Sequence, residues 1–116
     1  MPEVAELISR AVTCKIDGQY DEALELLREA LQTAPDNARI HFELGLVLGF
    51  IGEFDDSLAE IQQAVTLSPN NIEYINNLGL TCAMLGMYDE AKQAFEQVLQ
   101  LDPCDEVALK NIVFFT

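Results

Sequence analysis

The apolar side chains of this chain fall into short amphipathic segments separated by glycine and proline. Residues 38–50 carry apolar side chains on so much of their surface that a helix there must pack on more than one side. After Gly52, Leu58 and Ile61 begin a second segment with the spacing of one buried helical stripe. Pro69 stops that segment, because the residue before a proline is pushed out of the helical region. The pattern predicts a hairpin of two helices.

The hairpin pattern occurs three times with a period of 34 residues. Prolines, turn glycines, helix-starting aspartates and aromatic residues all keep this spacing. They are Pro35, Pro69 and Pro103; Gly18, Gly52 and Gly86; Asp21, Asp55 and Asp89; and Tyr20, Phe54 and Tyr88. Repetition at this period is typical of stacked helical repeats. We therefore predict repeats at residues 4–37, 38–71 and 72–105, followed by a capping helix over residues 105–116.

Small residues recur in the first helix of each repeat, at Ala11, Gly45 and Gly79. Glycine inside a helix costs about 1 kcal/mol relative to alanine. Close approach of the second helix of the same hairpin is the simplest reason to tolerate that cost. We therefore expect these positions to mark the contact between the two helices of each hairpin.

The three units resemble the tetratricopeptide repeat. Leu44-Gly45 and Leu78-Gly79 follow that family's motif in the first helix, and a Gly-x-Tyr/Phe-Asp turn and a closing proline complete it. The resemblance implies an all-α, right-handed superhelical solenoid of three helix-turn-helix hairpins with a seventh, capping helix. It implies one domain over residues 1–116, with the first helices lining a concave groove that binds peptides.

The proposed groove lies on the face of the first helices opposite the small residues. Its apolar members are Ile8, Val12, Ile16, Phe42, Leu46, Phe50, Leu80 and Met84. Its polar border consists of Arg39, Glu43, Glu73, Asn76 and Asn77. Apolar patches rimmed by polar groups usually mark binding sites. We expect a partner peptide or helix to bind there, with Phe42, Leu46 and Phe50, spaced four residues apart, as its main anchors.

The charge of the chain narrows the choice of partner. With 20 acidic against 6 basic residues, the formal net charge is −14, which disfavours nucleic acids and anionic membranes. We expect a protein partner that carries basic residues beside its apolar anchors. One subgroup of the family grips the acidic tails of heat-shock chaperones with basic side chains. The equivalent positions here are Ile8, Val12, Glu43, Glu73 and Asn77, none of which is a cation, and we therefore expect no binding of such tails.

The carboxyl end suggests an alternative function. The last residues, 112–116, contain four adjacent apolar side chains, which one helical face cannot bury. In the register of the repeats, Phe114 points to the edge of the groove and Phe115 to the side where another helix would pack. A self-assembling scaffold, in the form of a homodimer joined through Phe114 and Phe115, is the alternative to the adaptor.

Little in the sequence indicates chemistry. His41 is expected to be structural, Cys14 and Cys82 are expected in the core, and Cys104 is expected to be exposed. Three dispersed cysteines and one histidine lack the spacing of a zinc site. We expect no catalytic, cofactor or metal site, and enzymatic activity is the weakest of the three hypotheses. With no signal-peptide pattern and no apolar stretch longer than 44–51, a cytoplasmic location is the default.

Overall fold

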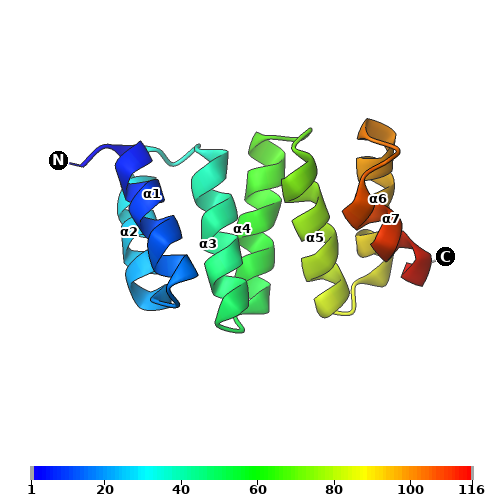
Figure 1. Ribbon diagram of the computed structural model, residues 1–116, viewed down its shortest axis with the longest axis horizontal. Helices are drawn as coiled ribbons and strands as arrows, with labels where there is room; N and C mark the ends of the chain where they lie inside the picture. Colours follow the sequence, from blue (N-terminus) through cyan, green and yellow to red (C-terminus); the bar gives the residue numbers. More distant parts are fainter. Residues whose placement is uncertain (1, 116) are drawn as a thin grey trace.

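The structure, a computed structural model, describes residues 2–115, and over that range it consists of helices joined by short turns, with no strand (Figure 1). Three hairpins follow one another, and a shorter helix and one 3-10 turn close the chain. The elements are α1 (Val4–Ile16), α2 (Tyr20–Thr33), α3 (Ala38–Phe50), α4 (Phe54–Leu67), α5 (Ile72–Met84), α6 (Tyr88–Leu101), α7 (Glu106–Ile112) and η1 (Val113–Phe115). The predicted all-α helical-repeat fold is confirmed.

Local sequence signals explain where these helices begin and end. The side chains of Asn37 and Asn71 accept hydrogen bonds from the backbone of Ile40 and Tyr74, at 3.2 and 3.0 Å, and so cap α3 and α5. The turn between α3 and α4 contains Gly52 with a φ of 85°, a left-handed conformation that residues with a Cβ rarely adopt. The turn glycines of the other two hairpins have the same conformation.

The small residues of the first helices lie where the two helices of a hairpin touch. A Cβ added at Gly45 would lie 2.5 Å from Cγ1 of Ile61 in α4. One added at Gly79 would lie 2.7 Å from Cζ of Phe95 in α6. Ile61 and Phe95 are fully buried. Both glycines therefore admit a large side chain of the second helix into the core, as the sequence predicted.

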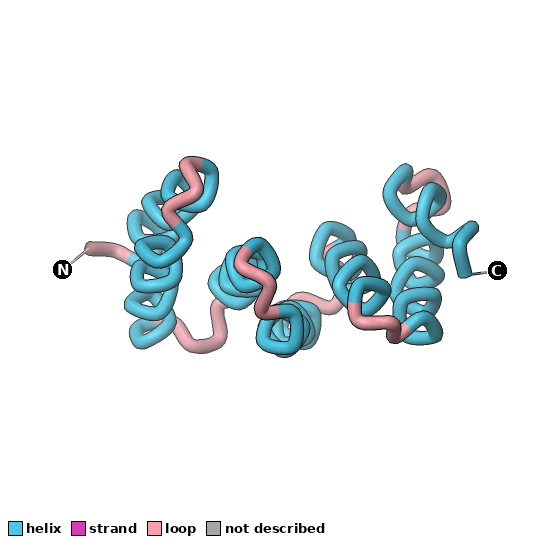
Figure 2. Tube along the Cα trace, turned by 90° about the horizontal axis from the view of Figure 1, so that it is seen from below, coloured by secondary structure: helices cyan, strands magenta, loops and turns pink. Residues whose placement is uncertain are grey.

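The hairpins stack along an arc whose two ends curve to the same side (Figure 2). The molecule is 48 Å long, and α1 and α7 lie at its opposite ends. Figure 1 presents the face to which α1, α3, α5 and α7 contribute, and we call this the inner face. Each hairpin packs against the first helix of the next one, so that buried side chains continue from one end of the stack to the other.

The seventh helix is shorter than expected. We predicted a helix over residues 105–116, but α7 ends at Ile112 and the chain tightens into the 3-10 turn η1. Asp105 caps α7 by accepting a hydrogen bond from the backbone of Ala108 at 3.0 Å. Thr116 lies outside the described residues. The change of helix type has consequences for Phe115 that are described below.

Candidate functional site

The inner face carries one row of exposed, large apolar side chains, which we call the apolar row. Ile16, Phe50 and Met84 occupy the same position in successive repeats and are 75%, 59% and 63% exposed. Each lies at the end of a first helix, just before the turn into the second. Beside them, Val12, Leu46 and Leu80 are only partly buried. All six belong to the groove proposed from the sequence.

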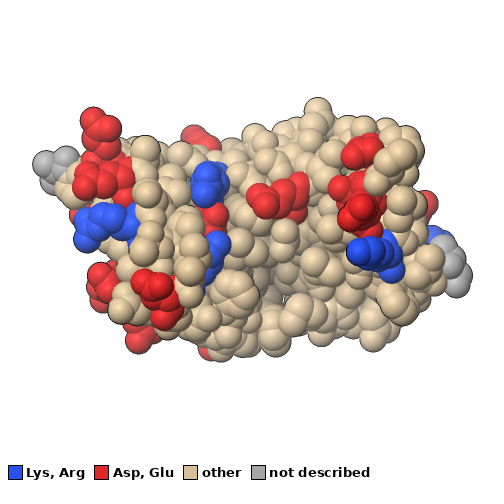
Figure 3. Space-filling model, in the orientation of Figure 1, with Lys and Arg blue, Asp and Glu red and all other residues tan. Residues whose placement is uncertain are grey.

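A pocket of about 200 Å³ opens beside this row where the second hairpin meets the third. We call it the second cleft. Five residues of the proposed groove lie among its lining residues, which are Gly45, Leu46, Gly49, Phe50, Phe54, Ser57, Ile61, Asn77, Leu80, Thr81 and Met84. In Figure 3 the inner face is hollowed over this region, and the atoms that border the hollow are mostly uncharged. None of the lining side chains is charged.

The equivalent space between the first and second hairpins, which we call the first cleft, is crossed by an ion pair. Lys15 takes the position of Gly49, and Glu43 takes the position of Asn77, 34 residues earlier in each case. The Lys15 Nζ lies 2.8 Å from the Oε1 of Glu43, and the side chains are only 16% and 6% exposed. The two clefts therefore differ in whether charged side chains bridge them.

A further pocket on the inner face, of about 410 Å³, lies between α1 and α3. Three more residues of the proposed groove, Ile8, Val12 and Arg39, line it together with Ala5, Ser9 and Thr13. Its mouth is more polar than that of the second cleft. Ile16 lies in neither pocket.

Phe42 is not an accessible anchor, contrary to the expectation from its spacing. It is only 2% exposed, and its ring stacks on that of Tyr74 in α5 with the centroids 4.4 Å apart. Successive residues of an α-helix are about 100° apart, so that Phe42 and Phe50, eight residues apart, point roughly 80° away from each other. Phe42 therefore faces the third hairpin, whereas Phe50 is 59% exposed and stacks on the ring of Tyr20 in the first hairpin, with the centroids 5.7 Å apart. Ile8, at the equivalent position in the first hairpin, is also buried.

Two members of the expected polar border are likewise buried. Glu43 is 5% exposed and pairs with the Nε of Arg39 at 3.1 Å as well as with Lys15. Asn76 is 5% exposed, and its Nδ2 donates a hydrogen bond to Oδ2 of Asp105 at 2.9 Å. Glu43 is thus neutralised by its neighbours, and Asn76 holds α5 to the start of α7. The expectation of a basic partner loses one of its supports, because it relied on Glu43 as free negative charge besides Glu73 and the net charge of −14.

Glu73 and Asn77 remain at the surface of the inner face. Glu73 is exposed and Asn77 is half-buried, with its Nδ2 donating to the backbone oxygen of Glu73 at 2.9 Å. Asn77 reaches the second cleft, whereas Glu73 does not line it.

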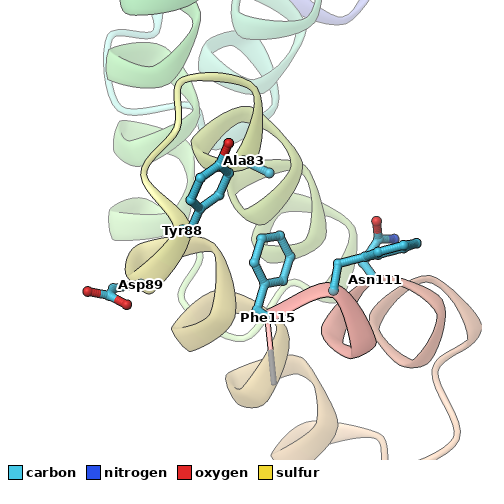
Figure 4. Close-up of a pocket in the computed structure, with 6 residues that line it drawn as sticks. Ala83, Tyr88, Asp89, Asn111 and Phe115 are labelled. Atoms are coloured by element: carbon cyan, nitrogen blue, oxygen red, sulfur yellow. The ribbon is translucent and has the colours of Figure 1, made fainter.

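The carboxyl end has its own pocket of about 510 Å³, one repeat beyond the second cleft (Figure 4). It is lined by Ala83, Tyr88, Asp89, Asn111, Phe114 and Phe115. Phe114 is 78% exposed. Phe115 is not turned outward as expected: its centroid lies 6.0 Å from those of Phe95 and Tyr88. The tightening into η1 brings Phe115 back onto the third hairpin. Self-association through Phe114 and Phe115 stays a prediction.

The histidine and the cysteines have the structural environments expected for them. His41 is buried, with Nδ1 2.9 Å from Oε2 of Glu60 and Nε2 2.7 Å from the backbone oxygen of Pro35. It links α3 to α4 and to the preceding turn. Cys14 and Cys82 are buried, and burial raises the pKa of both thiols, with nearby Glu22 adding to the rise at Cys14. Cys104 is exposed.

Over residues 2–115, no group of three or more His, Cys, Asp and Glu side chains is arranged to hold a metal ion. Within the same range, every helix is too short or too polar to cross a bilayer.

Family models match most of the repeat region. The model described as TPR repeat matches residues 14–49, and two models described as tetratricopeptide repeat match residues 38–71 and 72–103. A curated relative from Sinorhizobium fredii (strain NBRC 101917 / NGR234), the uncharacterized protein y4yS, is 46% identical over 44 residues. That segment is 38% of this chain and spans about a quarter of the relative's length, 24%.

Solved structures share the fold. The first TPR of Spaghetti (RPAP3), bound to HSP90 peptide SRMEEVD, has a TM-score of 0.92 at 20% identity, covering 97% of this chain and 90% of that one. The second TPR domain of human RPAP3, in complex with HSP70 peptide SGPTIEEVD, has a TM-score of 0.84 at 23% identity, covering 92% and 89%. Both peptides end in the acidic sequence Glu-Glu-Val-Asp.

These complexes overturn our exclusion of chaperone tails. That exclusion considered five positions, none of which is basic. Lys15 and Arg39, at other positions of the first helices, nevertheless bring two cations together around Glu43. The absence of cations at the five positions therefore excludes no acidic tail.

The matched models together run from residue 14 to residue 103, in register with the helical hairpins of the structure. This chain belongs to the tetratricopeptide repeat family.

Proposed function

We propose that the chain is a protein-interaction module that binds a peptide segment of another protein on its inner face. Tetratricopeptide repeats generally form such modules, and two domains of the same fold are bound to peptides. The anchors in this chain are Phe50 and Met84, which stand on either side of the second cleft.

The observation that carries the proposal is the exposure of the apolar row. Three equivalent positions keep large apolar side chains that are 59–75% exposed, on one face and beside a pocket. Burying such a side chain contributes about 1.5–3 kcal/mol, so two anchors give a partner substantial binding energy. Met84 adds an adaptable surface, because its side chain is flexible and its sulfur makes favourable contacts with aromatic rings.

The partner proposal is tested with peptides selected from a phage library of random 12-residue sequences on the immobilised chain. Selected peptides, and the HSP90 peptide SRMEEVD, are labelled and titrated by fluorescence anisotropy. We expect Phe50→Ser and Met84→Ser each to lower the affinity for the selected peptides tenfold or more. Ile51→Ser is the matched control, because Ile51 is also exposed but lies in the turn outside both clefts.

Melting curves by circular dichroism establish that each variant keeps the fold. Equal weakening by Ile51→Ser, or undiminished binding in both anchor variants, would contradict the proposed site. Failure to enrich any peptide over a Phe50→Ser/Met84→Ser double variant would contradict the function itself.

A second candidate function is self-assembly through the carboxyl end. Leu109 and Val113 of the closing segment are 46% and 62% exposed. Their equivalents in the first repeat, Leu7 and Ala11, are almost completely covered by the second helix of the same hairpin. A second molecule that covers this end would restore such a contact. Light scattering over a concentration series, with Phe114→Glu as the variant, tests it: a monomer at all concentrations would exclude self-assembly.

A further inference from the structure

Gly49 is a glycine that the packing of the helices does not explain. A Cβ added there would meet only Oγ of Ser57, at an ordinary distance of 3.4 Å, whereas one at Gly45 would collide with Ile61. Gly49 also has no left-handed backbone conformation that would require glycine. Glycine inside a helix lowers stability relative to alanine. Neither backbone geometry nor close helix contact therefore accounts for this residue.

Comparison of the repeats shows what a side chain at this position would occupy. The equivalent residues are Lys15 and Ala83, and Lys15 extends across the first cleft to Glu43. In the second cleft the missing side chain leaves Gly49 as part of the lining of the pocket, with Asn77 opposite it in the place of Glu43. The pocket thus occupies a space that the first pair of hairpins spans with its own side chains.

The lining of the second cleft defines the chemistry of an occupant. It contains no charged side chain, so a charged group would lose its water without gaining a partner. The hydroxyl of Ser57 is already engaged, donating to the backbone oxygen of Gly45 at 2.6 Å. Phe50, one face of which already stacks on Tyr20, lines the pocket with Phe54 and Met84, and aromatic rings and the methionine sulfur interact favourably with a further aromatic ring.

The size of the pocket agrees with this chemistry. A cavity of about 150 Å³ with apolar walls accommodates a benzene ring. The second cleft, at about 200 Å³, has room for a single ring of that size and its first methylene group. A flat ring can also lie directly on the backbone at Gly49, where no Cβ intervenes.

We propose that the second cleft binds one phenyl-bearing side chain of the partner, and that Gly49 is the residue that admits it. This inference rests on the proposed function and specifies its ligand: a peptide with an uncharged aromatic side chain. Gly49 acts here as a specificity-determining residue, because any larger side chain at this position would occupy the space of the ring.

The test uses N-acetyl-phenylalaninamide as the probe and N-acetyl-leucinamide as the matched aliphatic control. Both are titrated to tens of millimolar into the ¹⁵N-labelled chain and followed by NMR. We expect saturable shifts at the amides of Gly49, Thr81 and Met84, with phenylalaninamide binding at least fivefold more tightly than leucinamide. In Gly49→Leu, whose side chain fills the pocket, these shifts should be lost while the remaining spectrum is retained.

Equal binding of the two amides, or unchanged binding of phenylalaninamide to Gly49→Leu, would overturn the inference. If Gly49→Leu unfolds, Gly49→Ala replaces it, with a partial loss of binding expected and unchanged binding contradicting the proposal. If the selected peptides lose affinity for Phe50→Ser but bind Gly49→Leu as tightly as the unchanged protein, the proposed function stands and the aromatic pocket is disproved. The converse outcome is also distinguishable. If Gly49→Leu abolishes phenylalaninamide binding but Phe50→Ser and Met84→Ser leave peptide binding unchanged, the aromatic pocket stands and the proposed peptide site is disproved.

Discussion

The first and second clefts are built from equivalent positions of the same repeat, yet only the first is crossed by charged side chains. In the first cleft, Lys15 reaches Glu43 and joins the two hairpins by an ion pair that is largely shielded from water. In the second, Gly49 and Asn77 leave a pocket with apolar walls. The two clefts thus differ at two pairs of equivalent positions, Lys15 and Gly49, and Glu43 and Asn77. These differences make the first cleft a structural contact between hairpins and the second a candidate binding site.

The largest effect should come from removing the buried contact that joins the second and third hairpins. Phe42 packs on Tyr74 at this boundary, and replacing a buried phenylalanine by alanine costs about 3–5 kcal/mol of unfolding free energy. Phe50→Ala should cost no more than about 1.5 kcal/mol, because that ring is mostly exposed and loses chiefly its stacking on Tyr20. Urea denaturation of both variants measures the difference. Equal losses would mean that Phe50 belongs to the core rather than to the candidate site.

Breaking the ion pair of the first cleft should have the next largest effect. Lys15→Met leaves the buried carboxylate of Glu43 with only the Arg39 side chain, which is 54% exposed, and should cost about 3 kcal/mol. Arg39→Met is the control and should cost less than about 1 kcal/mol, as expected for a surface ion pair. The same urea denaturation experiment gives both values. If the two variants lose equal stability, Lys15 does not have the structural role described for the first cleft.

Two alanine substitutions within the second cleft should change stability in opposite directions. Gly49→Ala should raise the unfolding free energy by up to about 1 kcal/mol, since it improves helix propensity without a collision. Gly45→Ala should lower it by about 1 kcal/mol or more, because the new methyl group displaces Ile61. Thermal and urea denaturation show whether each substitution raises or lowers the free energy of unfolding. A destabilised Gly49→Ala would show that packing, not ligand access, requires glycine at position 49.

The smallest effects concern the chemistry of the three thiols. Burial raises the pKa of Cys14, next to Lys15, and of Cys82, next to Thr81, above the ordinary value of 9.0. Both should react with a thiol reagent at least about tenfold more slowly than exposed Cys104, since labelling requires local opening. The same shifts stabilise the fold fully below pH 9, and this contribution declines as the pH rises through the folded-state pKa values.

Single-cysteine variants resolve the three labelling rates, and urea melts between pH 7 and 10 test the loss of stability. Rapid labelling of Cys82 in the folded protein would mean that small molecules reach its side chain through the pocket that Leu78, Glu90 and Ala94 line on the α6 side.

Much of the fold could be predicted because its determinants are local and periodic. The spacing of Gly52 and Pro69 with their equivalents placed the helices, and Gly45 and Gly79 identified the close contacts within the hairpins. The exposed members of the apolar row were also found from the register, because their position is the same in each repeat. These features depend on helix geometry alone.

The burial of individual groove residues could not be predicted, because it depends on contacts between repeats, which the spacing of residues along one helix does not reveal. Phe42 and Phe50 share a spacing of four residues with Leu46, but the accumulated rotation turns Phe42 into the neighbouring hairpin. Glu43 looked like surface charge because its partner Lys15 lies 28 residues away. A signal for the second cleft was present nevertheless: comparing Lys15, Gly49 and Ala83 in register would have shown that only the second repeat lacks a side chain there.

The most direct test of the difference between the clefts is to transfer the residues of the first cleft into the second. The Gly49→Lys/Asn77→Glu double variant should form an ion pair across the pocket and keep the fold. Peptides selected on the wild-type chain should bind it at least tenfold more weakly, a loss of about 1.4 kcal/mol of binding free energy. Anisotropy titrations of those peptides measure their affinity for the double variant and for the unchanged protein. Unchanged affinity in a folded double variant would contradict the assignment of the second cleft as the binding site.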